Sequence, residues 1–425
     1  MKGREGTASG ERASGALGSK RTLPVASPGP RRLPLLDARP VDRAARPIYA
    51  VWEITLRCDL ACHHCGSRAG KPRANELTTA EALDLVDQLS ALGVREVTLI
   101  GGEAYLRPDW TDIIARVRER GMLCSMTTGG RGVDAEVARA AARAGLVSAS
   151  VSLDGLAPAH DEVRGLRGSF ASAIGAMRNL RAAGVRVSVN TQLHSANVRE
   201  LPALLDTIVA NGALAWQIAL TVPMGRAADR PELLLQPYDL LELFPILADC
   251  VERALRAGVV VMRGNNVGYF GPYEELFQTF DVVDHACGCG AGREILGIEA
   301  DGTIKGCPSL ATDRWSGGTG RDAPLVELWE RGAALQRLRA PREAALSGFC
   351  RTCYYAAECG GGCTWTADAL FGQPGNNPYC HHRALELAAR GLRERVVRVE
   401  APPGEPFDHG RFELVTEPLG EPGAR

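Results

Sequence analysis

The sequence predicts an α/β fold, namely a partial (β/α)6 TIM-like barrel followed by a smaller cysteine-rich region. Three observations lead to this prediction. From residue 48 to residue 257, short apolar segments alternate with amphipathic ones, the order expected of parallel strands joined by crossover helices. Glycine-rich or polar residues follow the predicted strands, at the end where barrel enzymes carry their chemistry. Most of the 13 cysteines lie at short, metal-like spacings.

The composition excludes several classes of protein. With 425 residues, 45% of them hydrophobic, the chain has enough material for one barrel-sized domain and a smaller one. A net charge of −1 gives no positive electrostatic potential that would attract nucleic acid, so a nucleic-acid-binding protein is not expected. No segment approaches the roughly 18 consecutive apolar residues of a membrane span, and the start lacks the apolar segment of a secretory signal. We therefore expect thiolate ligands in a reducing cytoplasm rather than disulfides.

The chain divides into four predicted parts. Residues 1–45 are rich in Gly, Ser, Ala, Arg and Pro and lack hydrophobic periodicity, which predicts a disordered extension. Residues 46–285 hold the predicted barrel, and residues 286–385 hold the second group of cysteines. We assign residues 386–425 to a C-terminal helix and a tail, because the segment from Pro402 onward is rich in Pro, Gly and Glu.

The barrel elements follow in order along the chain. Thr78 and Glu81 form a capping box at the start of a helix that Gly93 ends. Further helices are predicted for residues 108–120 and 238–257. The six predicted strands cover residues 49–56, 96–100, 123–127, 146–153, 185–192 and 216–222.

Three cysteines follow the first strand, with three and then two residues between them: Cys58, Cys62 and Cys65. Thiolates at this spacing on one loop can hold three corners of a [4Fe–4S] cluster and leave the fourth iron without a protein ligand. Such an open position can bind a substrate or cofactor, as it does in catalytic zinc sites. The same thiols with His63 or His64 would also suit a Cys/His zinc site.

A second motif decides between these alternatives. Gly101, Gly102 and Glu103 stand at the end of the second predicted strand, where glycines allow close approach of the backbone to a ligand. The cysteine spacing and this Gly-Gly-Glu segment, in this order, resemble the radical S-adenosylmethionine (SAM) superfamily. Two matched motifs, each at the carboxyl end of a strand, make zinc a distant second.

The resemblance implies a chemistry for both motifs. Cys58, Cys62 and Cys65 would ligate a catalytic [4Fe–4S] cluster whose open iron binds the amino and carboxylate groups of SAM. One electron delivered to the sulfonium then breaks a C–S bond and leaves a 5′-deoxyadenosyl radical. Glu103, or the backbone carbonyls beside it, would accept hydrogen bonds from the SAM ammonium. Ala104 replaces the proline that usually follows this motif.

Further strand ends also match the superfamily. Thr128 stands where the Thr-Asn-Gly loop near the SAM adenosine usually has Asn. Ser152 and Asp154 belong to a Ser-x-Asp-Gly segment whose polar groups reach the SAM ribose. Arg164 belongs to a His-Asp-x-x-Arg-Gly segment whose Arg pairs with a carboxylate, although a solvated side chain is the alternative. Asn190 is predicted as a cofactor-binding residue from its barrel position, with a structural amide as the alternative.

The cysteines after the barrel form a second pattern, which resembles the SPASM extension of radical SAM enzymes that modify peptides or proteins. All seven positions of that pattern are filled. The resemblance implies two auxiliary iron–sulfur clusters. The first would be held by Cys289, Cys307 and Cys363. The second would be held by Cys350, Cys353, Cys359 and Cys380.

Three cysteines stand outside both patterns. Cys124, in an apolar strand, and Cys250, in an amphipathic helix, are interpreted as buried apolar residues. Cys287 lies two residues before Cys289 and is predicted as an additional ligand of the first auxiliary cluster. An inert cysteine and a thiol that returns a hydrogen atom to a substrate radical are the alternatives.

The resemblance covers roughly residues 48–385 and implies a function. We expect the enzyme to cleave SAM reductively and to modify a ribosomally made peptide by a crosslink or an epimerisation. A flavodoxin or ferredoxin-type protein would supply the electron. Because no separate winged-helix domain is found, peptide recognition falls to another surface or to a separate recognition protein. Alternatives are action on a small molecule, such as a tetrapyrrole side chain, and a non-catalytic iron–sulfur carrier.

Overall fold

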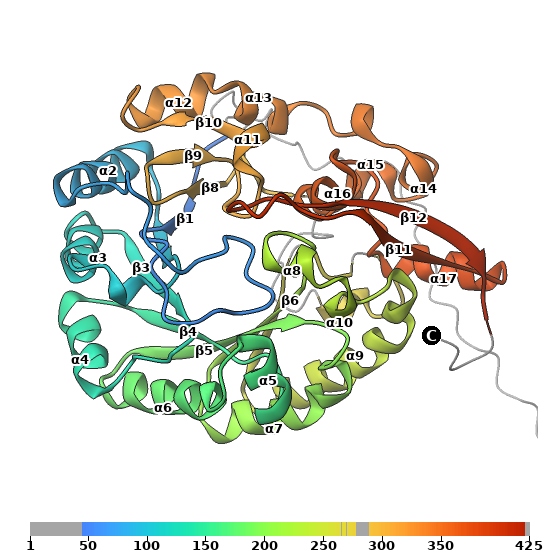
Figure 1. Ribbon diagram of the computed structural model, residues 1–425, viewed down its shortest axis with the longest axis horizontal. Coiled ribbons are helices and arrows are strands. Elements are labelled where there is room, and N and C mark those ends of the chain that lie inside the picture. Colours follow the sequence, from blue (N-terminus) through green and yellow to red (C-terminus); the bar gives the residue numbers. More distant parts are fainter. Residues whose placement is uncertain (1–44, 265, 269, 278–288, 421–425) are drawn as a thin grey trace, which may run out of the picture. The chain divides into compact units, whose positions relative to one another are not determined.

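The computed structural model describes residues 45–264, 266–268, 270–277 and 289–420. Ten strands of these residues form one sheet in the order β10-β9-β8-β1-β2-β3-β4-β5-β6-β7 (Figure 1). The strands are β1 (Tyr49–Glu53), β2 (Glu96–Ile100), β3 (Leu123–Thr128), β4 (Ser148–Ser152), β5 (Arg186–Leu193), β6 (Ala215–Leu220), β7 (Val260–Arg263), β8 (Ile295–Ile298), β9 (Thr303–Lys305) and β10 (Ser316–Thr319).

The sheet is an open parallel barrel with an antiparallel end. Strands β1 to β7 pair in parallel in sequence order, and β8 pairs in parallel with the other side of β1. Strands β9 and β10 then add on in antiparallel fashion. The sheet ends at β7 and β10, which do not pair with each other among the described residues. The predicted partial barrel is confirmed, and the first strands of the cysteine-rich region continue the same sheet.

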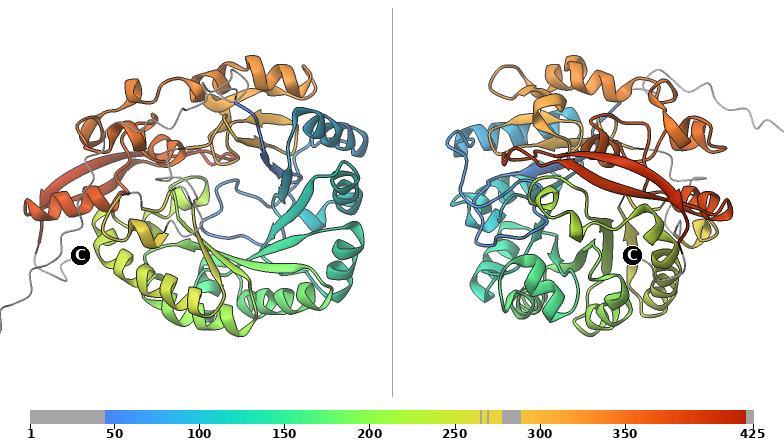
Figure 2. Two further views of the ribbon diagram at one scale, coloured as in Figure 1. Left: turned by 180° about the vertical axis from the view of Figure 1, so that it is seen from behind. Right: turned by 45° about the vertical axis from the view of Figure 1, so that its right-hand side comes forward.

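Helices cover the outside of the barrel, as Figures 1 and 2 show. The predicted capping box is present, because the Thr78 side chain accepts from the Glu81 backbone and the Glu81 carboxylate accepts from the Thr78 backbone. Gly93 ends this helix at φ 97°, a conformation that favours glycine. The barrel helices are α2 (Thr79–Leu92), α3 (Trp110–Glu119), α4 (Ala135–Ala144), α5 (Ala157–Arg164), α6 (Ser169–Ala182), α7 (Leu201–Ala210), α8 (Arg226–Asp229), α9 (Leu240–Arg256) and α10 (Glu274–Phe277).

The two faces of the sheet differ in polarity. Val151 and Val189 belong to the apolar core beneath the helices. Ser152 and its register partner Asn190 lie on the other face, as their positions in the strands require. A barrel with a polar interior has room for a polar cofactor at the carboxyl ends of its strands.

The segment after the barrel is largely helical apart from the strands that extend the sheet. None of the helices in the described ranges is long and apolar enough to cross a membrane. The helices of this segment are α11 (Thr312–Trp315), α12 (Leu325–Arg331), α13 (Ala333–Arg339), α14 (Gly348–Arg351), α15 (Ala356–Cys359), α16 (Thr364–Phe371) and α17 (His381–Ala389).

The predicted C-terminal tail is wrong where the chain forms two further strands. Strands β11 (Leu392–Glu400) and β12 (Arg411–Pro418) form an antiparallel hairpin, drawn in red in Figure 1. The physical reason is an alternation that composition concealed: Phe412 is buried while its neighbours Arg411 and Glu413 are exposed. Proline and glycine residues of this segment lie largely in the connecting loop, where they suit a turn.

Two predictions fall outside the described residues. Residues 1–44 of the predicted extension are among them, and so is Cys287. Both therefore stay predictions.

Candidate active site

The three-cysteine segment forms a loop between β1 and α2. The backbone N–H of Cys58 donates to the carbonyl of Gly70 at 3.0 Å and that of Gly70 donates to the Leu56 carbonyl at 2.9 Å, which closes the loop at its base. All three thiols, of Cys58, Cys62 and Cys65, line one cavity of about 290 Å³ at the carboxyl ends of the barrel strands. The structure thus brings these three predicted ligands to a single site.

Each of the three sulfur atoms receives an N–H group. The backbone N–H of Leu60 lies 3.4 Å from Cys58 Sγ, and that of Ala69 lies 3.4 Å from Cys65 Sγ. The Arg164 guanidinium reaches Cys62 Sγ at 3.6 Å. Donors of this kind stabilise thiolates and tune iron–sulfur clusters, so the donor set suits a [4Fe–4S] cluster.

The glycines of the Gly-Gly-Glu segment pack against the cysteine loop. The backbone N–H of Gly102 donates to the Thr55 carbonyl and that of Glu103 to the Arg57 carbonyl, both at 2.8 Å. A Cβ atom added at Gly102 would lie 2.1 Å from the Arg57 oxygen, a distance that no side chain tolerates. These glycines therefore allow the close contact that joins β2 to the cysteine loop, and both also line the cavity.

Glu103 is buried and holds the neighbouring strand end. Its carboxylate accepts from Thr128 Oγ1 at 2.5 Å and from the Gly129 backbone N–H at 2.6 Å. Burial raises the pKa of Glu103 to about 7, although these two hydrogen bonds oppose the shift. Glu103 and Thr128 thus lie together at the cavity, as the prediction of a shared binding site requires.

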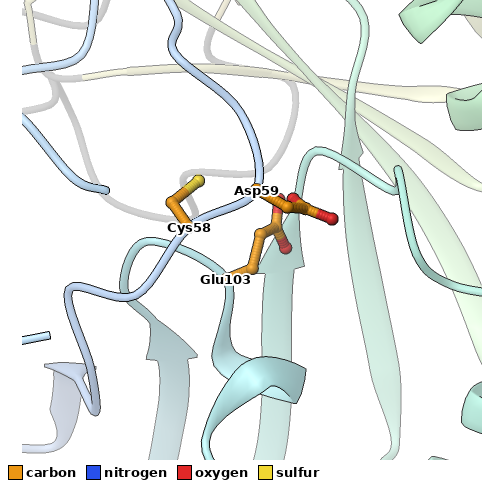
Figure 3. Close-up of side chains that lie close together, drawn as sticks. All are labelled: Cys58, Asp59 and Glu103. Carbon is orange, nitrogen blue, oxygen red and sulfur yellow. The ribbon is translucent and has the colours of Figure 1, made fainter. Parts of the chain in front are cut away.

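Figure 3 shows Cys58 with the carboxylates of Asp59 and Glu103. One ligand atom from each of these three residues lies within 4.8 Å of the others. Asp59 also accepts a hydrogen bond from the Tyr105 hydroxyl at 3.1 Å. The Glu103 carboxylate already accepts hydrogen bonds from Thr128 and Gly129. We therefore assign Cys58, Asp59 and Glu103 no metal site of their own and interpret the two carboxylates as holding the cysteine loop in place.

A buried ionic network connects the cysteine loop to the end of β4. Arg164 Nη2 lies 2.6 Å from Asp154 Oδ2, and His64 Nε2 lies 3.3 Å from the same oxygen. Burial alone would raise the pKa of Asp154, but Arg164 and His64 hold it well below its usual range. Arg164 was predicted to pair with a carboxylate, and in the structure that carboxylate is Asp154, which His64 also contacts.

Three predicted cofactor-binding residues stand apart from the cavity. Ser152, Asp154 and Asn190 do not line it in the described part of the chain, whereas Arg164 does. Asp154 acts on the site through Arg164 and His64. Asn190 Oδ1 is buried without a hydrogen-bond partner among the described residues, so it remains available to a ligand.

Sequence reasoning missed several residues of the cavity wall. Glu53 on β1 and Gln192 on β5 have the strand register that faces the interior, which a closer reading of strand periodicity would reveal. Met224 follows β6 in the Pro-Met-Gly segment. Trp365 and Phe407 come from the C-terminal part of the chain, and no local motif marks them.

The second group of cysteines separates into two sets. Burial and then the charge of nearby Cys289 raise the pKa of Cys307 to about 12, with Cys363 contributing as well, so these three thiols lie close together. A second cavity is lined by the other four, Cys350, Cys353, Cys359 and Cys380. The SPASM resemblance implies the same two sets, whose role as cluster ligands stays a prediction.

Comparisons with known proteins agree with this geometry. A model of the radical SAM superfamily matches residues 52–208. The mycofactocin maturase MftC of Mycobacterium ulcerans is 32% identical over 345 residues, which covers 79% of this chain and 88% of the relative. An AdoMet-dependent heme synthase of Methanosarcina barkeri is 29% identical over 353 residues, covering 79% and 97%.

A solved structure shares the fold. Streptococcus suis SuiB, bound to its precursor peptide SuiA, superposes with a TM-score of 0.61 at 17% identity, covering 79% of this chain and 75% of SuiB. Together with the sequence relatives, this match extends from the barrel into the cysteine-rich region. The chain is an enzyme that belongs to the radical SAM superfamily, in the branch with a C-terminal SPASM region.

Proposed function

We propose that this radical SAM enzyme modifies a ribosomally made peptide, by a crosslink or an epimerisation. One observation carries the proposal: the cavity that holds the three thiols and Gly-Gly-Glu is also lined by Ser309 and Trp365 of the cysteine-rich region. A substrate in this cavity therefore contacts both parts of the chain. Support comes from similarity to a mycofactocin maturase and from the fold shared with SuiB, which was solved with its precursor peptide.

We assign the catalytic cluster to Cys58, Cys62 and Cys65. When bound, a [4Fe–4S] cluster and SAM supply a 5′-deoxyadenosyl radical that takes a hydrogen atom from the substrate. The N–H groups of Leu60, Ala69 and Arg164 stabilise the three thiolates. Gly101, Gly102, Glu103 and Thr128 line the cavity and would provide backbone atoms for SAM. Asn190, whose buried Oδ1 has no hydrogen-bond partner among the described residues, stays a predicted cofactor-binding residue.

The seven cysteines of the C-terminal region are assigned to two auxiliary clusters. Cys350, Cys353, Cys359 and Cys380 surround one small cavity, as four ligands of a closed cluster should. Cys289, Cys307 and Cys363 form the other set beside Ser309 at the active-site cavity. Cys287 remains our prediction for an additional ligand of the cluster that Cys289, Cys307 and Cys363 would hold. A flavodoxin or ferredoxin-type donor in a reducing cytoplasm would keep these sites supplied with electrons.

A second candidate function is the modification of a tetrapyrrole side chain. The similarity to an AdoMet-dependent heme synthase favours it. The cavity offers apolar wall residues, among them Leu60 and Val222, that would suit either a peptide side chain or a macrocycle edge. We rank the peptide first because the identity to MftC is higher.

The test begins with anaerobically reconstituted enzyme, SAM and dithionite. Synthetic versions of the short peptides encoded beside the gene are added, with Fe-coproporphyrin as the competing substrate. We expect 5′-deoxyadenosine together with a mass change in one peptide, and about twelve iron atoms per chain if all three clusters are cubanes. Product from the porphyrin alone would favour the second candidate. Zinc without acid-labile sulfide would refute the cluster assignment.

Changing Cys350 or Cys353 to Ala tests the auxiliary assignment. We expect peptide modification to be lost while some uncoupled 5′-deoxyadenosine formation continues, because the catalytic cysteines lie on another loop. Iron content should fall by about four atoms per chain. Unchanged iron would contradict the assignment.

A further inference from the structure

The loop of the C-terminal hairpin reaches the active-site cavity. Phe407, between β11 and β12, lines the same cavity as Cys58, Cys62 and Cys65 and is only 8% exposed. Figures 1 and 2 show the hairpin extending from α17 to the strands β8 and β9. A segment more than 340 positions further along the chain thus completes the wall of the cavity.

Backbone contacts fix this loop onto the cysteine loop. The N–H of Phe407 donates to the Gly66 carbonyl at 3.1 Å, and the N–H of Gly225 donates to the Asp408 carbonyl at 2.7 Å. The N–H of Arg226, next to Gly225, donates to the Cys65 carbonyl at 3.0 Å. The hairpin loop therefore contacts the residue that follows the third predicted cluster ligand.

A buried carboxylate holds the loop in shape. Asp408 Oδ1 accepts from Arg68 Nε at 2.9 Å, and Oδ2 accepts from the backbone N–H groups of Gly404 and Glu405 at 2.6 and 2.9 Å. The Asp408 side chain is 6% exposed and that of Arg68 is 14% exposed. Each oxygen of this carboxylate is thus paired, and the loop has one well-defined conformation.

Phe407 adopts a backbone conformation that L residues rarely adopt. Its φ is 60°, in the left-handed region, and Arg68 is the other non-glycine residue with positive φ in the described part of the chain. Bulky side chains in this region are uncommon, and such positions cluster at functional sites. A glycine would fit the turn without strain, so the ring itself must contribute something that the turn does not require.

The ring lies between the two halves of the molecule. Lys305 Nζ, fully buried on β9, lies 3.9 Å from the centre of the Phe407 ring. Phe407 also packs in one apolar cluster with Met224 of the barrel and Leu310, with the partly buried Cys307 and Trp365 against it. The Trp365 indole N–H lies 3.4 Å from Met224 Sδ. Phe407, Met224 and Trp365 therefore form a continuous apolar wall of the cavity.

We propose that Phe407 is a substrate-positioning residue, whose ring packs against an apolar side chain of the peptide residue to be modified. The proposal rests on the proposed function, because it requires a peptide in this cavity. The cavity is also lined by the polar residues Gln192, Thr221 and Arg226, which suit the peptide backbone. The hairpin thus couples substrate position to the cysteine loop through the Phe407–Gly66 hydrogen bond.

The experiment compares Phe407→Gly, Phe407→Tyr and Phe407→Leu with the wild-type enzyme. Glycine keeps the turn at positive φ and removes the ring, so strain and ring contact are separated. The matched control is Val399→Gly, an exposed position on the same hairpin outside the cavity wall. The readouts are iron content, the affinity of a fluorescein-labelled peptide in the presence of SAM, KM and kcat, and product formed per 5′-deoxyadenosine.

We expect Phe407→Gly to weaken peptide binding and raise KM by about tenfold or more, and to lower product per 5′-deoxyadenosine. Phe407→Tyr keeps the ring and should stay within about threefold of wild type, while Phe407→Leu should be intermediate. Val399→Gly should match wild type. Wild-type binding and coupling in Phe407→Gly would overturn the proposal.

Two other outcomes are also decisive. Loss of iron from both Phe407→Gly and Phe407→Leu would show that the ring is a structural brace, and this would overturn the proposal too. If only the glycine variant loses iron, a wild-type KM in Phe407→Leu would overturn it, and a raised KM would support it. If the wild-type enzyme modifies none of the peptides, the proposed function is refuted, and the role of Phe407 is refuted with it because it requires a peptide substrate.

Discussion

Two loops meet at the cavity, and they are held in different ways. The cysteine loop, residues 58–70, is closed by backbone hydrogen bonds at its own base and by the glycines at the end of β2. The hairpin loop, residues 401–410, depends on one carboxylate, Asp408, and on contacts to residues far away in the chain. The first carries the chemistry and the second closes the wall.

This difference has a physical cause. A cluster needs ligands within a few ångströms of each other, so three of them fit on one short loop and leave a visible spacing. A substrate wall needs only an apolar surface in the correct place, which any element can provide if it reaches the site. The comparison teaches that ligand loops are locally encoded, whereas substrate contacts arise from tertiary structure.

The largest effect is expected at the cysteine loop. Cys62→Ala should abolish SAM cleavage, because two thiolates do not hold a cluster with an open iron, and about four iron atoms per chain should be lost. Cys250→Ala is the matched control, since this buried cysteine in α9 lines neither of the two cavities that the predicted cluster ligands line. The measurements are iron, acid-labile sulfide and 5′-deoxyadenosine. Formation of 5′-deoxyadenosine by Cys62→Ala would show that the catalytic cluster is misplaced.

The next effect concerns the contact between β2 and the cysteine loop. Gly102→Ala places a Cβ atom 2.1 Å from the Arg57 carbonyl oxygen, so one of the two backbones must move. We expect SAM cleavage to fall by about tenfold or more, because small displacements of a reacting site are costly. Gly175→Ala, with no atom within 4 Å of the added Cβ, is the control. Equal rates for both variants would contradict the role of this contact.

A smaller effect is expected at the hairpin loop. Asp408→Ala leaves Arg68 Nε and two backbone N–H groups without their acceptor, which should lower the free energy of unfolding by about 1–3 kcal/mol. The exposed Glu405→Ala should change it by less than about 0.5 kcal/mol. Denaturant unfolding of the reconstituted proteins compares the two. If Asp408→Ala also leaves peptide KM unchanged, the loop has no part in positioning substrate.

The same contrast separates what the sequence predicts from what it does not. The six barrel strands and the capping box at Thr78 follow from short patterns of spacing and periodicity, whereas the grouping of the seven later cysteines came from the SPASM resemblance. The hairpin was taken for a tail because composition outweighed the alternation around Phe412. Phe407 could not be found from sequence, because its position depends on Gly66, Gly225 and Asp408, which lie on three separate segments.

The cluster environment shows an intermediate case. Arg164 was found by its motif, but its contact with Cys62 Sγ and its pairing with Asp154 depend on how α5 packs beside the cysteine loop. Ser152 was predicted from a motif at a strand end and Asn190 from its barrel position, and both lie on the interior face of the sheet without lining the cavity among the described residues. Motifs therefore identify the residue types of this site, whereas the position of each residue along its strand decides which of them reach the cavity, as Gln192 does on β5.

The last prediction concerns Glu53, which lines the cavity and lies 2% exposed at the end of β1. Burial raises its pKa to about 8, although Arg73 at 3.4 Å opposes the shift. In the unfolded chain the carboxyl titrates near 4.5, so between these pH values the folded state binds the proton more often. The free energy of unfolding must then fall as the pH rises, by at most about 1.4 kcal/mol per pH unit. Glu53→Gln removes this dependence, so its free energy of unfolding should gain on that of wild type as the pH rises from 6 to 8. The exposed control Glu343→Gln should show no such gain. If the difference in free energy of unfolding between wild type and Glu53→Gln is the same at pH 6 and pH 8, this carboxyl is ionised in the folded enzyme.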